Sequence, residues 1–228
     1  MRRFCAAMLA WISFTVPAAN TQVRYSTAEA IARANSLTGL ERLSGKPIAI
    51  AVKVAEDVTP FLGQRNVGKP AWRLEYPAAA PYQSKFVVLL DAVTGHLLSI
   101  TAMVDEGRRD SDNMPLYDEA TRILRSQDEV YEGYPAQDPK VDFLNALESI
   151  AQGGFGSPGR ARMIHAVYVL DSQRGATSRG VWAITLRGLP PIAAHGPDPK
   201  SVPKARRTHM RNLVDAATGK VLQAVNSP

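Results

Sequence analysis

Hydrophobic and polar residues follow the same order in two stretches of the chain. In each stretch a segment with hydrophobic residues at helical spacing comes first, and alternating or continuously hydrophobic segments follow. A period near 3.6 residues is typical of a half-buried helix, and a period of two is typical of a half-buried strand. The pattern therefore predicts one helix and then four strands, twice over.

The first stretch carries clear signals for its helix. Ser26 and Glu29 have the spacing of a capping box, in which each side chain accepts a hydrogen bond from the backbone amide of the other residue. Gly39 allows the left-handed backbone with which many helices end. Ile48 and Ile50 then alternate with alanines, which predicts a half-buried strand. The four strands are predicted at residues 47–55, 72–76, 85–90 and 96–102.

The second stretch has its own helix start. Asp138 is expected to cap the helix, and Pro139 suits the first helical position because a missing amide hydrogen costs nothing there. Hydrophobic residues recur along one face up to Ile150, and Gly153 and Gly154 are expected to end the helix. The strands that follow are predicted at residues 163–170, 181–186, 208–214 and 220–225.

Each stretch ends in the same hairpin signature, LDAVTGHLL at residues 90–98 and VDAATGKVL at residues 214–222. The aspartate can accept a hydrogen bond from the backbone two residues on, and the glycine accepts the positive φ of a bulged hairpin. Each signature lies downstream of a strand that contains a tryptophan, Trp72 or Trp182. We interpret this as an internal duplication, which determines the architecture. The predicted fold class is α+β, with two repeated units that each pack a helix on a four-stranded antiparallel sheet.

This order of elements, closed by Asp-Ala-x-Thr-Gly, resembles the PepSY family of small extracytoplasmic domains. The resemblance covers roughly residues 24–103 and 138–226, and the second copy matches the family's closing hairpin better than the first, where His96 replaces the usual lysine or glutamate. The resemblance implies a cystatin-like helix on a curved sheet and a secreted or envelope location. It also implies a non-catalytic role in binding or restraining other proteins, proteases among them.

The amino-terminal residues have the pattern of a secretory signal peptide. Arg2 and Arg3 precede an apolar run at residues 4–16, which is too short to span a bilayer, and small residues follow. We expect cleavage after Ala18 or Ala19 and a periplasmic or secreted product, and a buried N-terminal helix is the alternative. The predicted parts are the signal peptide (1–19), the first unit (20–104), a connection with a short helix near 116–126 (105–137) and the second unit (138–228).

Few residues carry recognisable chemistry. Cys5 is the only cysteine and leaves with the signal peptide, so no disulfide or thiolate site is expected. The four histidines are widely spread, and no catalytic serine motif occurs. The formal charge of +6 falls to +4 when Arg2 and Arg3 are removed, which is too small to predict a nucleic-acid partner. We therefore predict neither an enzyme nor a cofactor or metal site, and the oligomeric state stays open.

A basic cluster near the C-terminus is the candidate partner-binding surface. It lies at the end of an insertion of about fourteen residues within 188–207, a segment rich in proline, glycine and basic residues. Period two places Arg207, His209 and Arg211 on one strand face, where they can meet an acidic protein, a lipid headgroup or a polyanion. The alternative is a solvated edge strand that charge protects from aggregation. The proposed binding residues are Lys204, Arg206, Arg207, His209 and Arg211.

These observations favour an exported, non-catalytic binding or regulatory module of the bacterial cell envelope, such as a modulator of a protease or of another envelope protein. The alternative is a periplasmic carrier of a small molecule or lipid, which would use the concave face of the sheet. A third hypothesis, a hydrolase, requires a serine or aspartate within hydrogen-bond reach of a histidine inside a cleft.

Overall fold

The computed structural model describes residues 23–54, 68–82, 84–103, 133–171, 178–190 and 208–227. The predicted signal peptide, the predicted helix near 116–126 and most of the predicted insertion, residues 191–207, lie outside these described residues.

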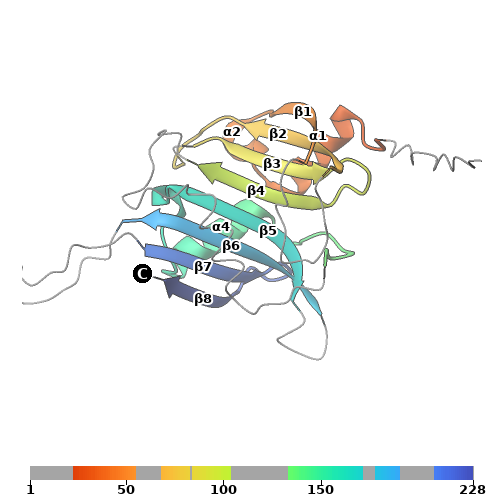
Figure 1. The fold of residues 1–228 in the computed structure, drawn as a ribbon. Coiled ribbons are helices and arrows are strands. Elements are labelled where there is room, and N and C mark those ends of the chain that lie inside the picture. Colours follow the sequence, from red (N-terminus) through yellow and green to blue (C-terminus); the bar gives the residue numbers. More distant parts are fainter. Residues whose placement is uncertain are drawn as a thin grey trace, which may run out of the picture.

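Among the described residues, eight strands form one antiparallel sheet, and each strand pairs with its neighbours in chain order (Figure 1). The sequence predicted a four-stranded sheet for each unit, but β4 pairs with β5 through residues such as Ile100 and Ala166, so the sheet is continuous. The strands are β1 (Ile48–Lys53), β2 (Pro70–Tyr76), β3 (Phe86–Asp91), β4 (Leu97–Met103), β5 (Met163–Asp171), β6 (Arg179–Leu189), β7 (Thr208–Asp215) and β8 (Val221–Ser227).

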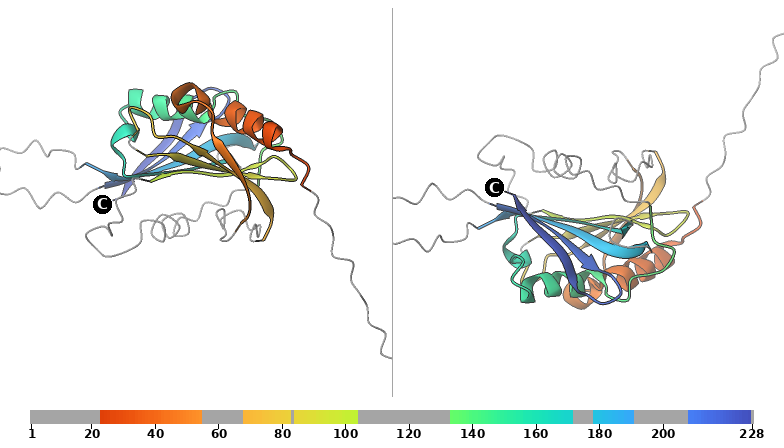
Figure 2. Two further views of the ribbon diagram at one scale, coloured as in Figure 1. Left: turned by 90° about the horizontal axis from the view of Figure 1, so that it is seen from above. Right: turned by 90° about the horizontal axis from the view of Figure 1, so that it is seen from below.

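The two longer described helices, α1 (Thr27–Thr38) and α4 (Phe143–Gln152), lie on the same face of this sheet (Figure 2). The short helix α2 (Glu41–Ser44) follows α1, and a 3-10 helix, η2 (Pro158–Arg160), precedes β5. Leu37 of α1 and Leu147 of α4 belong to one hydrophobic core with buried side chains from the strands, among them Phe86 and Trp182. The helices and the sheet are therefore held together by a shared core.

The first helix begins and ends as the sequence predicted. The Oγ of Ser26 accepts a hydrogen bond from the amide of Glu29 at 3.3 Å, and the Glu29 carboxylate accepts one from the amide of Ser26 at 2.8 Å. Gly39 follows the helix with a φ of 68°. Leu40, the next residue, is fully buried.

The second helix begins later than predicted. Its N-cap is Asp142, whose carboxylate accepts a hydrogen bond from the amide of Asn145 at 3.0 Å. The prediction that Asp138 caps this helix is wrong, because its carboxylate pairs with Arg33 of α1 instead. The residue directly before the cap also bonds outside the helix, because the amide of Val141 donates to the carbonyl of Ala216 at 2.9 Å.

The two predicted hairpins have matching hydrogen bonds. The Oδ1 of Asp91 accepts from the amides two and three residues on at 2.8 and 2.9 Å, and the Oδ1 of Asp215 does so at 2.9 and 3.0 Å. Gly95 has a φ of 70° and Gly219 a φ of 76°, a backbone region that favours glycine. The strand register shifts just before each aspartate. These are the bulged turns that the signature predicts.

Strand β1 lies at one edge of the sheet and differs from the expected half-buried strand. Its two largest hydrophobic side chains are exposed, Ile48 at 66 % and Ile50 at 45 %. Ala49, on the other side of the strand, packs on the core beneath the helices. The isoleucines therefore face away from the core, and burial along β1 does not alternate regularly, since Ala49 and Val52 are the partly buried residues.

Candidate functional site

The predicted basic cluster is only partly within the described residues. Lys204, Arg206 and Arg207 lie outside them, whereas His209 and Arg211 share one face of β7. Arg211 is buried and His209 is half-buried. The interpretation as a solvated edge strand is wrong for β7, because this strand pairs with β6 on one side and β8 on the other.

His209 and Arg211 belong to a buried polar row on the sheet face opposite α1 and α4. The Nε of Arg187, a fully buried residue of β6, donates a long hydrogen bond of 3.4 Å to Nδ1 of His209. The register places His165, Thr185 and Arg211 side by side across β5, β6 and β7. Burial lowers the pKa of His165 to about 4, so its imidazole is neutral at pH 7. This row is part of the protein interior and offers no open contact surface at Arg211.

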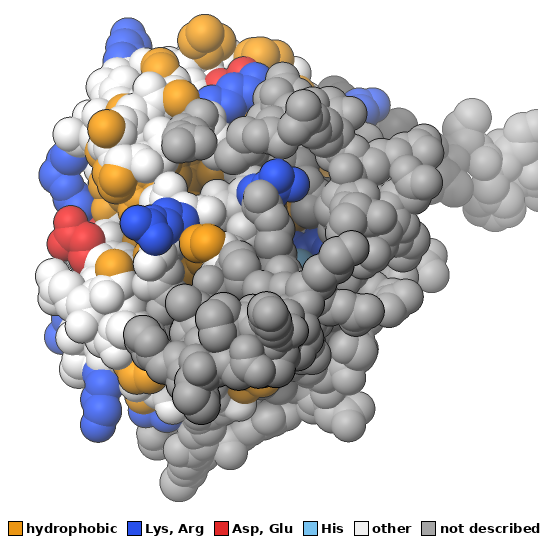
Figure 3. Space-filling view, turned by 90° about the vertical axis from the view of Figure 1, so that its left-hand side faces the viewer, with side chains coloured by type: hydrophobic (Ala, Val, Ile, Leu, Met, Phe, Trp, Pro, Cys, Tyr) orange, Lys and Arg blue, Asp and Glu red, His pale blue; other side chains and the backbone are white. Residues whose placement is uncertain are grey.

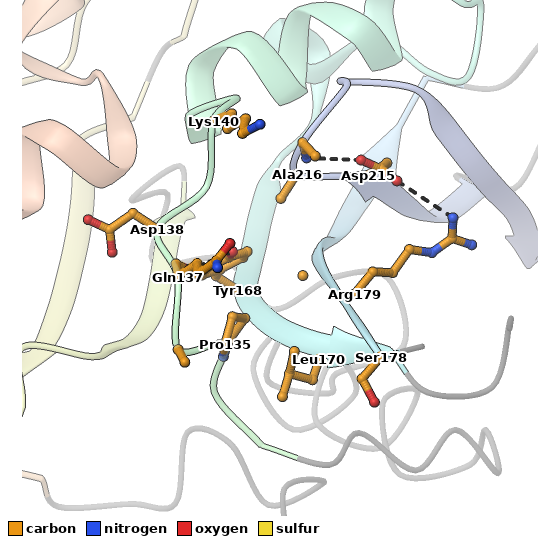
Figure 4. Close-up of a pocket in the computed structure, with 13 residues that line it drawn as sticks. Pro135, Gln137, Asp138, Lys140, Tyr168, Leu170, Ser178, Arg179, Asp215 and Ala216 are labelled. Carbon is orange, nitrogen blue, oxygen red and sulfur yellow. Dashed lines mark hydrogen bonds and ion pairs between the residues drawn. The ribbon is translucent and has the colours of Figure 1, made fainter. Parts of the chain in front are cut away.

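A pocket of about 470 Å³ lies beside the β7–β8 hairpin and is the candidate functional site (Figure 4). The segment before α4, the end of β5, the start of β6 and the hairpin turn all contribute to its wall. The lining residues are Pro135, Ala136, Gln137, Asp138, Lys140, Tyr168, Leu170, Ser178, Arg179, Gly180, Asp215, Ala216 and Ala217.

Tyr168 forms a fixed wall of this pocket. Its hydroxyl donates a hydrogen bond to the carbonyl of Gln137 at 2.9 Å, and its ring lies 5.2 Å from the Trp182 ring, centre to centre. Burial raises the pKa of Tyr168 to about 12, so the hydroxyl stays protonated. A Cβ atom at Gly180 would lie 2.5 Å from this hydroxyl, so β6 needs glycine where Tyr168 crosses it.

Charged side chains surround the opening. Arg179 lies 3.6 Å from the Asp215 carboxylate that also closes the hairpin turn, and Figure 4 shows both on the same side of the pocket. Lys140 is exposed, and Asp138 on the opposite side is held by Arg33, which lowers the pKa of its carboxyl group. The Arg179 side chain is 37 % exposed and that of Asp215 is 14 % exposed, so the arginine is the accessible partner of this pair.

Apolar residues such as Pro135 and Leu170 line part of the walls, and the opening carries side chains of both charges, Lys140 and Arg179 with Asp138 and Asp215. Apolar walls with a few polar groups are typical of sites that bind an organic group. Sequence reasoning missed Lys140, Tyr168 and Arg179 because none belongs to a motif. Gly180, two residues before Trp182 in a predicted strand, was the available signal of a close approach. Within the part of the chain that the structure describes, no group of three or more His, Cys, Asp or Glu side chains is placed to hold a metal ion. The helices among those residues include none with the length and hydrophobicity needed to cross a membrane.

Comparison with known proteins shows no family. No family model matches the chain, and no curated protein matches it. Among solved structures, the chain is similar to a crystal structure described as a "putative lipoprotein" from Clostridium difficile 630, at 13 % identity over 79 % of this chain and 82 % of that one. The TM-score is 0.25, and a likeness this low carries no argument about fold or function.

Proposed function

We propose that this protein is an exported, non-catalytic binding or regulatory module of the bacterial cell envelope, built from two PepSY-like repeats. Residues 20–104 and 138–228 form the two repeats, and the pocket beside the second hairpin receives part of a partner or ligand. Modulation of a protease or another envelope protein is the role that this resemblance favours.

Matched contacts around the two tryptophans support the proposed repeat. The indole Nε1 of Trp72 donates to the carbonyl of Tyr25 at 2.9 Å, and that of Trp182 donates to the carbonyl of Val141 at 2.8 Å. Tyr25 and Val141 each stand directly before the N-cap residue of a helix. Each also donates its amide to the alanine carbonyl that follows the hairpin aspartate, at 3.1 and 2.9 Å.

The export part of the proposal is supported by sequence alone. Basic residues, a short apolar run and small residues follow one another in the order that signal peptidase substrates have. Cys5, the only cysteine, lies within this segment. The processed chain would therefore hold no thiol that could be oxidised outside the cytoplasm.

The pocket is the observation that carries the binding role. The hydrogen bond from Tyr168 to Gln137 joins its wall to the segment before α4, and charged side chains of both signs lie at its opening. The carrier alternative has less support, because its space beneath the helices is filled. Trp182 is fully buried there, with its ring centre 5.9 Å from that of Phe143 and 5.2 Å from that of Tyr168.

The proposal is tested by expressing the full chain with a C-terminal tag in a bacterium, fractionating the cells and reading the N-terminus by mass spectrometry. A photo-crosslinking amino acid at Lys140 then reports what enters the pocket. We expect an envelope-fraction product processed after residue 18 or 19, and a reproducible crosslinked species of defined mass.

The matched control is the same amino acid at Gln152, an exposed residue at the far end of α4. Retention of the unprocessed chain in the cytoplasm would overturn the export role. Equal crosslinking from Lys140 and Gln152, or none from either, would overturn the binding role.

A further inference from the structure

The first strand presents an unpaired edge. Among the described strands, β1 and β8 lie at the two ends of the sheet, so each has one side without a neighbouring strand. All six residues of β1 pair with β2, and no register shift interrupts them. A regular edge of this kind offers backbone N–H and C=O groups to an added strand.

The two edges differ in their side chains. Ile48 and Ile50 are exposed on one face of β1, whereas none of the exposed large hydrophobic residues belongs to β8. Natural edge strands are usually protected by charges, proline or bulges. On β1 the protection is confined to the ends, with Pro47 before the strand and Lys53 as its last residue. Its centre is open and apolar, which is the character of a contact surface.

The side chains around this edge carry excess positive charge. Arg73 of β2 lies opposite Ile50, and its side chain is 42 % exposed. Glu75, opposite Ile48, already pairs with both Arg73 and Lys85, at 2.7 and 2.9 Å. Lys53 is exposed at the end of β1. Figure 3 shows hydrophobic side chains beside lysine, arginine and acidic side chains at the top of the molecule, the end at which β1 lies in Figure 1.

We propose that β1 binds an extended segment of a partner protein as a ninth strand. The backbone of the segment pairs with β1, its alternate apolar side chains cover Ile48 and Ile50, and an acidic residue lies opposite Lys53. Strand addition of this kind takes affinity from main-chain hydrogen bonds and specificity from alternate side chains. The inference rests on the proposed protein-binding role but is independent of the pocket.

An acidic partner segment is favoured over a second copy of this chain. Pairing two β1 strands would place the surplus cations of both copies around one small interface, and the chain without its predicted signal peptide is already basic, with a formal charge of +4. Opposite charge on the partner instead favours encounter and fixes register.

The test uses a peptide library as the probe. Its members are short, end-capped peptides with Val, Ile, Leu or Phe at alternate positions, Thr or Ser between them and Asp or Glu at both ends. Amide hydrogen exchange of the full chain is measured with and without the library. We expect slower exchange at residues 48–53, and Ile50→Lys should weaken binding at least tenfold because it places a cation at the centre of the edge.

The control variant is Ala224→Lys, which places the same cation at an exposed position of the other edge strand and should leave binding unchanged. A library with Lys in place of the acids should bind at least threefold more weakly, and backbone N-methylation of the peptides should abolish binding.

Unchanged exchange at β1, or equal losses of binding in the two lysine variants of the protein, would overturn the inference. So would concentration-dependent protection of β1 without peptide and a dimer mass by light scattering, since a second copy would then be the occupant. The Lys140 crosslink is read separately, so loss of β1 binding alone leaves the pocket role standing.

Discussion

The Trp182 indole donates a 2.8 Å hydrogen bond to the carbonyl of Val141, the residue directly before the N-cap of α4. This bond joins the centre of the sheet to the start of a helix. Because the Trp182 side chain is fully buried, water does not easily replace this bond for the indole N–H.

We predict that Trp182→Phe lowers the free energy of unfolding by about 1–3 kcal/mol, since it removes the donor and leaves the Val141 carbonyl without it. Urea unfolding followed by circular dichroism measures the loss. Trp72→Phe is the matched variant, because it removes the equivalent bond to Tyr25. A loss below about 0.5 kcal/mol in both variants would show that these bonds do not hold the helices to the sheet.

We expect the two hairpin aspartates to stabilise their turns as hydrogen-bond acceptors and not through their negative charge. Asp91→Ala and Asp215→Ala each remove an oxygen that accepts two turn amides, and we expect each to cost about 1–2 kcal/mol of stability. Asp→Asn keeps that oxygen, so its cost should be less than half as large. Thermal unfolding of the four variants decides the matter, and equal losses in the Asn and Ala variants would point to charge instead of turn geometry.

Asn212 is a buried amide inside an apolar layer. It is fully buried, and neither its amide nitrogen nor its amide oxygen has a hydrogen-bond partner among the described residues. Three residues before the hairpin aspartate, the first unit has Val88, which is also fully buried. We predict that Asn212→Val raises the free energy of unfolding by about 1–2 kcal/mol, because it removes an unsatisfied polar group. A lower unfolding midpoint in urea for this variant would contradict the prediction.

His165 should make the protein sensitive to acid. Its pKa is lowered by burial from 6.5 to about 4, so below pH 6.5 the unfolded chain binds a proton that the folded chain rejects. The contribution of His165 to the free energy of unfolding is therefore fully present above pH 6.5 and is lost as the pH falls to about 4. The loss is roughly 3 kcal/mol over this range.

Nuclear magnetic resonance of the His165 ring checks the pKa directly, and we expect a titration midpoint near 4. His165→Gln should reduce the slope of unfolding free energy against pH between 6.5 and 4. A ring that titrates near 6.5 in the folded protein would contradict the assignment.

Local sequence signals predicted the turns and the first helix well. Ser26, Glu29 and Gly39 act within a few residues of one another, so the capping box and the helix end follow from chain chemistry alone. The same is true of Asp91 and Asp215 in the hairpins. The predicted start of α4 was wrong because two acidic residues, Asp138 and Asp142, can each cap the helix. Which of them does so depends on a distant residue, Arg33, which pairs with Asp138.

The candidate site could not be predicted in the same way. Lys140, Tyr168 and Arg179 come from separate elements, and only the pairing of β5 with β6 brings two of them near the hairpin. The burial of Arg211 could not be predicted either, because its neighbours on the sheet face, Thr185 and His165, come from strands far away in the sequence.

By itself, the sequence determined the ends of the first helix and the bulged turns, because those features depend on hydrogen bonds between residues a few positions apart. It also placed the strands, because their hydrophobic residues follow a strand-like pattern. Only the tertiary structure decided that β4 joins β5 in one sheet, that Arg211 is interior and that Ile48 and Ile50 remain exposed. Those outcomes depend on which strands become neighbours, and neighbours are chosen by the shared core between the helices and the sheet.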